Sequence, residues 1–259
     1  MMKKGIDTGK KLYLIGGLAL LLLYSVNCLV ILPVRNMLAS DIVFASNIVL
    51  INLMSLLSEL LEVTAISVFY ATFLLALYRC GARKGAAMLW IFAAVTAYKY
   101  AANAAVSWAY EGSIPSAWGL DIANLLFYVA LEMLQLIILY ALVQKMITAH
   151  TDARDVRNRA IEKAGGQAEK DRVYPFTRLY EKSNCLLRSA LICAVVTVIA
   201  KCLGSLISDI WLIALYGLPE DPSTWLLMAV NYISMAIFGF VVYFVTVAGM
   251  NALFDKTAE

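Results

Sequence analysis

Six charged side chains lie inside long apolar segments of this chain, where an unpaired charge is energetically unfavourable. They are Glu59, Glu62, Lys99, Glu132, Lys201 and Asp209. A charge inside a membrane span costs about 2.5–3.5 kcal/mol on insertion scales, and such residues usually face the protein interior. Side chains of these types can pair with each other or bind a charged solute, and two neighbouring glutamates can share a proton.

Each charged residue belongs to a polar stripe with helical spacing. Lys99 is followed by Asn103 after four residues, and Lys201 by Ser205 and then Asp209 at the same interval, so each series lies on one helix face. The residues predicted to bind a ligand are Glu59, Glu62, Lys99, Asn103, Asn124, Glu132, Lys201, Ser205, Asp209 and Asn231. Other members of the stripes are Asn27, Asn52, Ser55, Thr96, Ser107, Tyr128, Gln135, Thr197 and Ser234.

The depth of these stripes predicts a cavity. Counted from the predicted outer loops at a rise of about 1.5 Å per residue, they extend from the outer interface to the midplane. The inner halves of the same segments are almost purely apolar. We therefore expect a polar cavity that opens outward. Four acids exceed two lysines, so we expect a cationic or zwitterionic ligand, or a protonated glutamate.

Structural ion pairing is the alternative, and the two interpretations do not exclude each other. Lys99 and Glu132 lie at similar depth in one predicted hairpin and can neutralise each other. Lys201 has no acid in its own hairpin, which predicts a partner in Glu59 or Glu62 and a link between the first and third hairpins.

Small residues form the face opposite Lys99. They are Ala93, Ala97, Ala101 and Ala105, each four residues from the next. Such ridges allow helices to approach closely, so we expect helix packing here, inside the bundle or with a partner.

The motifs of common catalytic sites are missing. His150 is the single histidine, which leaves two-histidine metal sites and histidine-based triads without their parts. No Gly-x-Ser-x-Gly, His-Glu-x-x-His, Walker A or Cys-x-x-Cys sequence occurs. The sequence thus disfavours an enzyme, and it predicts no catalytic residue, metal site, cofactor or nucleic-acid partner.

The composition identifies the environment of these side chains. Of the 259 residues, 62% are hydrophobic and 15% charged, whereas soluble domains are about half apolar and a quarter charged. Spanning a membrane takes about 20 helical residues. Residues 1–259 are therefore predicted to form one all-α integral membrane domain, a polytopic bundle of six transmembrane helices. The predicted spans are 12–32, 47–78, 86–110, 119–149, 188–214 and 224–253. No predicted span contains a proline, and Pro33 follows the end of the first.

Basic residues predict the orientation. They gather before the first span, after the second and in the 150–187 connection, while the other side has only Arg35. Lysine and arginine are retained in the cytoplasm, so both termini are predicted to be cytoplasmic in a multi-pass protein of the cytoplasmic (plasma) membrane.

An internal repeat relates the third and fourth spans to the fifth and sixth. Ser116, Trp118 and Asn124 match Ser223, Trp225 and Asn231 at identical spacing. A weaker match extends to the first two spans. The expected architecture is three hairpins that turn at the outer side.

The 150–187 connection is the one sizeable cytoplasmic loop. Residues 153–170 predict a charged helix that ends at Gly165-Gly166 or resumes after them. We favour a solvated connector. The alternative is a coupling loop for an ATPase, since six-span ABC permeases place theirs between spans four and five.

In topology and site depth the chain resembles the substrate-capture component of energy-coupling-factor vitamin transporters. That resemblance implies six spans, cytoplasmic termini, an outward-open pocket and docking through an Ala-x-x-x-Ala surface. The docking alanines of that family lie in the first span, whereas the ridge here lies in the third. The predicted function is binding or transport of a small polar solute, with membrane or ATPase subunits as partners. The rival is a non-transporting scaffold or accessory subunit of a larger membrane complex.

Overall fold

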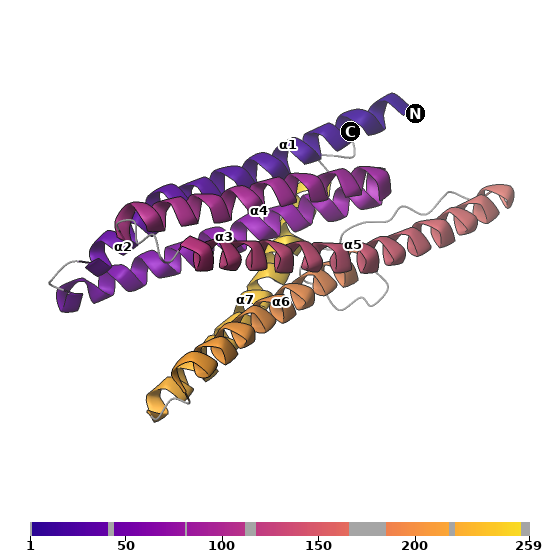
Figure 1. Cartoon of the computed structure of the whole chain (residues 1–259). Coiled ribbons are helices and arrows are strands. Elements are labelled where there is room, and N and C mark those ends of the chain that lie inside the picture. The colour runs from indigo at the N-terminus through magenta and orange to yellow at the C-terminus, as the bar shows by residue number, and fades with distance from the viewer. Residues whose placement is uncertain are drawn as a thin grey trace.

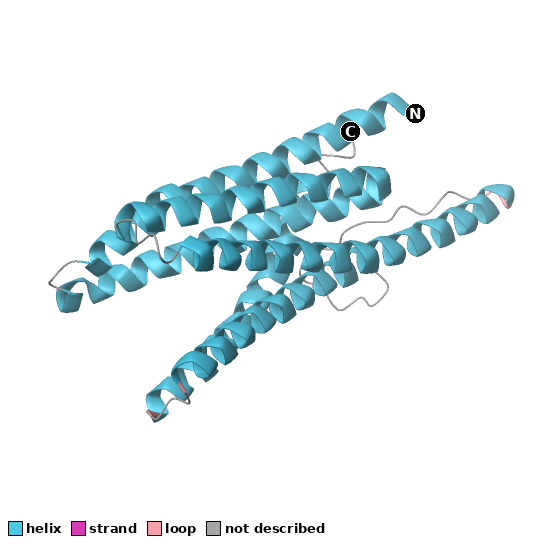
Figure 2. Cartoon of the chain, viewed as in Figure 1, coloured by secondary structure: helices cyan, strands magenta, loops and turns pink. Residues whose placement is uncertain are grey.

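The computed structural model describes residues 2–40, 44–80, 82–111, 118–165, 185–217 and 221–254 (Figures 1 and 2). The helices are α1 (Met2–Val26), the π-helical η1 (Asn27–Ile31), α2 (Leu32–Ser40), α3 (Phe44–Cys80), α4 (Ala82–Glu111), α5 (Trp118–Lys163), α6 (Cys185–Tyr216) and α7 (Pro222–Phe254). No strand occurs within these described ranges, which confirms the predicted all-α class.

Five helical stretches are long and apolar enough to cross a membrane. They are Lys10–Leu38, Val49–Tyr78, Leu126–His150, Cys185–Trp211 and Thr224–Leu253. These stretches indicate a multi-pass protein in a lipid bilayer, as the sequence predicts. The last has the predicted bounds, the second differs by two residues at its start, and the others differ more.

The predicted count of six spans is not confirmed. The missing member is α4, which covers the predicted span 86–110 but does not reach the apolar character of the other five. Lys99, Asn103 and several tyrosines lie in this helix and lower its mean hydropathy. The predicted repeat likewise finds no confirmation in the described residues.

The first span is longer than predicted because α1, η1 and α2 follow one another without a break. Pro33 therefore does not lie past the span end, as expected, but inside α2. A proline lacks the backbone N–H, and its ring clashes with the carbonyl four residues earlier. Directly before it, the Leu32 N–H donates to the Asn27 carbonyl five residues back. This wider turn accommodates the proline.

The central helix of the bundle is α3, which contacts each of the other six α-helices. In an 18-residue apolar part of this helix 72% of the residues are buried, against 17–33% in the corresponding parts of the other four candidate spans. The burial is confined to one half. Nearly every residue from Val63 to Leu77 is buried, whereas none from Val49 to Leu61 is.

Close approach of backbones builds the packed half. A Cβ added to Gly16 of α1 would meet the Thr72 hydroxyl of α3, and one added to Gly239 of α7 would meet a methyl group of Val198. Phe69 packs against Phe92 of α4 with ring centroids 4.5 Å apart. The packed half thus ties α1, α4 and α7 around α3 and α6.

At the other end of the bundle the helices separate. The α6–α7 pair runs away from α3 and α4 toward the lower left of Figure 1. This is the end at which α4 ends and α5 begins. No described residue in the first half of α3 is fully buried at this end, although α2 still packs beside α3.

The helix α5 continues well past the bundle (Figure 1). Its last part, up to Lys163, coincides with the start of the predicted charged helix, so that helix is an extension of the fourth predicted span rather than a separate element. Gly165 follows with φ +77°, the left-handed conformation that commonly ends a helix. Residues 166–184 lie outside the described part of the chain.

Candidate functional site

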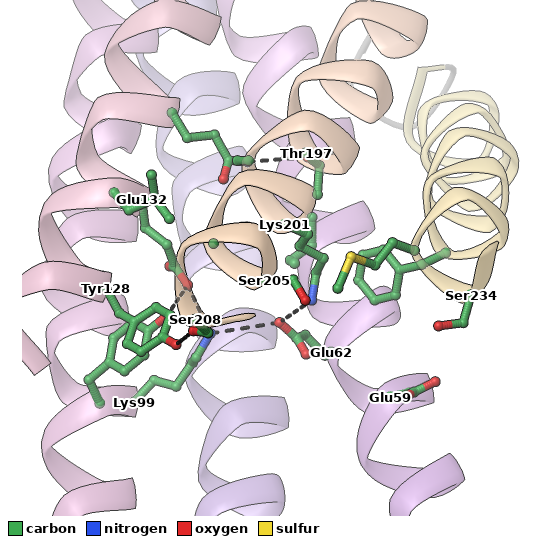
Figure 3. A pocket seen from close by; sticks show the side chains of 18 of the residues that line it. Glu59, Glu62, Lys99, Tyr128, Glu132, Thr197, Lys201, Ser205, Ser208 and Ser234 are labelled. Atoms are coloured by element: carbon green, nitrogen blue, oxygen red, sulfur yellow. Dashed lines mark hydrogen bonds and ion pairs between the residues drawn. The ribbon is translucent and has the colours of Figure 1, made fainter. Parts of the chain in front are cut away.

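Side chains of α3, α4, α5, α6 and α7 line a cavity of about 420 Å³ in the middle of the bundle (Figure 3). It extends from the packed half toward the end where the helices separate. Seven predicted ligand-binding residues line it: Glu59, Glu62, Lys99, Glu132, Lys201, Ser205 and Asn231. The sequence stripes therefore converge on one space.

Four of these residues form a continuous chain of alternating charge. Lys201 Nζ lies 3.2 Å from Glu62 Oε1, and the same carboxylate oxygen lies 3.7 Å from Lys99 Nζ. Lys99 Nζ in turn lies 3.1 Å from Glu132 Oε1. The chain crosses from α6 through α3 and α4 to α5 (Figure 3).

Both predicted pairings are confirmed by these distances. Lys99 pairs with Glu132, and Lys201 pairs with an acid of α3, which is Glu62 rather than Glu59. The link between Glu62 and Lys99 was not predicted. It joins two separate pairs into one network whose four formal charges sum to zero.

The two lysines differ in exposure. The Lys99 side chain is 13% exposed and that of Lys201 is 31% exposed. Lys99 lies near aromatic faces, with Nζ 5.1 Å from the Tyr24 ring centroid and 4.8 Å from that of Tyr100. Lys201 Nζ lies 4.2 Å above the Phe238 ring. Lys201 is therefore the more exposed of the two lysines that line the cavity.

Tyr100 positions Glu132, the acid at the α5 end of the ion-pair series. The Tyr100 hydroxyl donates to Glu132 Oε1 at 2.6 Å, the same oxygen that Lys99 approaches. The Tyr100 ring stacks on Tyr128 with centroids 6.0 Å apart. Tyr128 reaches across to α6, where its hydroxyl lies 2.9 Å from Ser208 Oγ.

A hydrogen-bonded group closes the cavity toward the packed half. The fully buried Tyr70 hydroxyl lies 2.7 Å from Thr197 Oγ1, and Gln135 Nε2 donates to both oxygens at 3.1 and 3.2 Å. Thr197 Oγ1 donates to the Cys193 carbonyl, so it accepts from its other two partners. These bonds connect α3, α5 and α6 in one layer.

The α6–α7 wall carries its own polar contact. Asn231 Nδ2 donates to Ser205 Oγ at 3.0 Å, and both residues line the cavity, as predicted. Asp209 lies one turn beyond Ser205 but does not line it. Its carboxylate accepts from the Tyr232 hydroxyl at 2.9 Å, so here the ligand-binding prediction is not supported.

Two further predicted residues are not part of the cavity as described. Asn103 does not line it, and its side-chain oxygen is buried with no hydrogen-bond partner among the described residues. The buried oxygens of Tyr24, Asn27 and Thr96 are in the same condition. These unpaired oxygens lie on α1, η1 and α4, the helices around Lys99. The side chain of Asn124 lies outside the described residues.

The alanine ridge does not pack inside the bundle. Ala97, Ala101 and Ala105 are exposed, and Ala93 is half-buried. The in-bundle alternative is therefore wrong, because the face opposite Lys99 points away from α3. The predicted alternative, contact of this surface with a partner helix, stays a prediction, and lipid is the other possible neighbour.

Several cavity residues were missed in the sequence. Tyr70, Phe92, Tyr100, Ser208 and Phe238 line it without belonging to a predicted stripe. Aromatic residues are common in apolar helices, so their type gave no signal. Ser208 lies three residues after Ser205 and could have been found by its helical spacing.

Comparison of the chain with protein families, curated proteins and solved structures finds no match.

Proposed function

We propose that this protein is a six-span membrane protein that binds and carries a small polar solute in the cavity between α3, α4, α5, α6 and α7. The observation that supports this proposal most strongly is the cavity. Its volume of about 420 Å³ falls within the range of about 300–1,000 Å³ found for small-molecule sites. Charged, amide and hydroxyl groups converge in it from five helices, four of which contain candidate membrane spans.

Crossing of the membrane by α4 is part of this proposal. It has 30 residues, or about 45 Å at 1.5 Å per residue, which exceeds a hydrocarbon layer. It packs beside α1, α3 and α5, three helices of the candidate spans. Its one charge at mid-depth, Lys99, has two acidic neighbours, which lowers the cost of placing it in a membrane.

The proposed orientation rests on the distribution of basic residues. The end of the bundle with the start of α1 carries the lysine-rich N-terminus, and α5 projects from it with further basic residues. We place that end in the cytoplasm of a bacterial cytoplasmic membrane. The separated end, with the cavity, then faces outward, and substrate capture follows from this direction of opening.

Native mass spectrometry of protein extracted from its own membrane tests the binding function. We expect a small molecule to co-purify with the wild-type protein. Gly204→Phe should remove it, because even a Cβ at this position would lie 3.3 Å from Leu131 across the cavity wall. Leu203→Phe is the matched control, since Leu203 is exposed on the same helix.

The melting temperatures of these variants show whether each is folded, and Leu131→Phe is a second way to fill the cavity. Wild-type protein that carries no small molecule would contradict the proposal. So would a ligand that both cavity-filling variants retain.

A scaffold or accessory subunit is the second candidate, and the exposed alanine ridge on α4 favours it. Residues that permit close helix packing lie on a surface that this chain leaves uncovered. The gene neighbourhood separates the candidates. Genes for an ATPase and a coupling subunit favour transport, whereas genes for secretion or the cell envelope favour the scaffold.

A further inference from the structure

The cavity holds one more acid than its ion pairs use. Lys99 and Lys201 are balanced by Glu62 and Glu132 in the alternating chain. Glu59 lines the same cavity but has neither an ion pair nor a hydrogen bond among the described residues, and no dashed line reaches it in Figure 3. The five charged groups of the cavity therefore sum to one negative charge.

The surplus negative charge lies on the side of the cavity that faces the separated end of the bundle. Glu59 lies three residues before Glu62 on α3, about one turn toward the end where the helices separate. Its side chain is exposed, so a molecule that enters from that end meets Glu59 before it meets the ion-pair chain. An uncompensated carboxylate at this depth is expensive, and a positive charge beside it relieves that cost.

The remaining cavity surface favours an organic cation over a metal ion. Phe92 and Tyr128 contribute aromatic rings to the lining beside Tyr100 and Phe238, which already face Lys99 and Lys201, and such rings attract ammonium groups. In the part of the chain that the structure describes, no three His, Cys, Asp or Glu side chains are grouped as ligands for a metal. A metal ion would therefore find at most two such ligands together among the described residues.

We propose that the cavity binds a small organic ammonium ion with one net positive charge, and that Glu59 is its counter-ion. This inference rests on the proposed function and specifies its ligand class. A monocation brings the cavity to neutrality. A zwitterion would leave the surplus negative charge in place.

Thermal melting of the detergent-purified protein with four probes tests the inference. Choline and ethanolamine are the cationic probes, 3,3-dimethyl-1-butanol is the neutral carbon analogue of choline, and glycine betaine is the zwitterion. We expect at least one cation to raise the melting temperature and the neutral analogue to leave it unchanged, because binding to the folded state alone stabilises it.

Variants then assign the effect to Glu59. Glu59→Gln should need about tenfold more cation for the same shift, whereas Glu59→Asp keeps the charge and most of the affinity. Glu162→Gln on the projecting part of α5 is the matched control and should respond like wild type. Since Glu59 is exposed and unpaired, its amide variant should fold.

The inference is overturned if neither cation shifts the melting temperature, or if the neutral analogue or betaine is as effective. Wild-type affinity in Glu59→Gln would overturn it as well. Failure here is distinguishable from failure of the proposed function. A co-purified neutral or anionic molecule that Gly204→Phe removes would leave solute binding intact and refute only the ammonium ligand.

Discussion

Lys201 Nζ and Glu62 Oε1 lie 3.2 Å apart although 139 residues separate them in the chain. This contact joins α6 to the central helix α3. Apolar side chains pack the other half of the bundle. At the level of the cavity this ion pair, its continuation through Lys99 and the hydrogen bonds of Tyr70 and Tyr128 connect the helices. In this account the charged residues both stabilise the bundle and line the binding cavity, and separate variants test their contributions to stability and to ligand binding.

Loss of the Lys201 charge should destabilise the protein. Lys201→Met leaves Glu62 with one lysine instead of two, and we expect a loss of about 1–3 kcal/mol in unfolding free energy, below the ~3–5 kcal/mol of fully buried pairs. The smaller value follows from the 31% exposure of Lys201. Thermal melting in detergent measures it.

A companion change identifies the partner. Glu62→Gln in the Lys201→Met background removes the unbalanced acid, and Lys99 retains Glu132, so part of the stability should return. Glu59→Gln in the same background should not restore it. Equal melting of wild type and Lys201→Met would refute the stabilising role of the pair.

Two buried threonines, one in each of two polar stripes, should respond differently to valine. Thr197 Oγ1 has three hydrogen-bond partners, so Thr197→Val should cost about 1–2 kcal/mol. Thr96 Oγ1 is buried without a partner among the described residues, so Thr96→Val should be neutral or stabilising by up to about 1 kcal/mol. Each variant is the other's control in the same melting assay. A larger loss from Thr96→Val than from Thr197→Val would show that an unseen partner serves Thr96.

The alanine ridge should matter for assembly rather than for folding. Ala101 is exposed, so Ala101→Leu should leave the melting temperature of the isolated chain within about 1 °C of wild type, as for most surface changes. If a partner helix binds here, the same variant should lose that partner in native gels of mild-detergent membrane extracts. Ala130→Leu on the exposed surface of α5 is the matched control. Unchanged complexes in both variants would assign the ridge to lipid.

The predictable part of this structure follows from its apolar composition and its helical period. Long apolar runs predicted the all-α class and six spans, of which five are candidate spans in the structure. The helical class follows because every backbone polar group in a membrane must be satisfied within a helix. The spacing of polar residues brought seven of the ten predicted site residues to one cavity. The same spacing did not bring Asp209 to the cavity. Its carboxylate accepts a hydrogen bond from the Tyr232 hydroxyl of α7 instead.

What the sequence left open depends on contacts between helices. No pattern within α3 distinguishes Glu59 from Glu62 as the partner of Lys201, because they lie on the same face. The continuation of the first span through Pro33 depends on the π turn before it, which no residue type announces. The outward face of the alanine ridge was equally unpredictable, since amphipathic patterns show which residues share a face and not which neighbour covers it.

The most direct test of the central claim is access of water to the cavity from outside the cell. Single cysteines replace Ser208 and Asn231, two lining residues, after substitution of Cys28, Cys80, Cys185, Cys193 and Cys202. Asn103→Cys, at a residue whose side-chain oxygen is buried outside the cavity, and Leu206→Cys, on the exposed apolar surface of α6, are the controls. An impermeant thiol reagent added to intact cells should label the two lining positions and spare both controls. Lining cysteines as unreactive as the controls, in protein whose melting temperature shows it to be folded, would mean a closed, dry, ion-paired core and would contradict an outward-opening solute site.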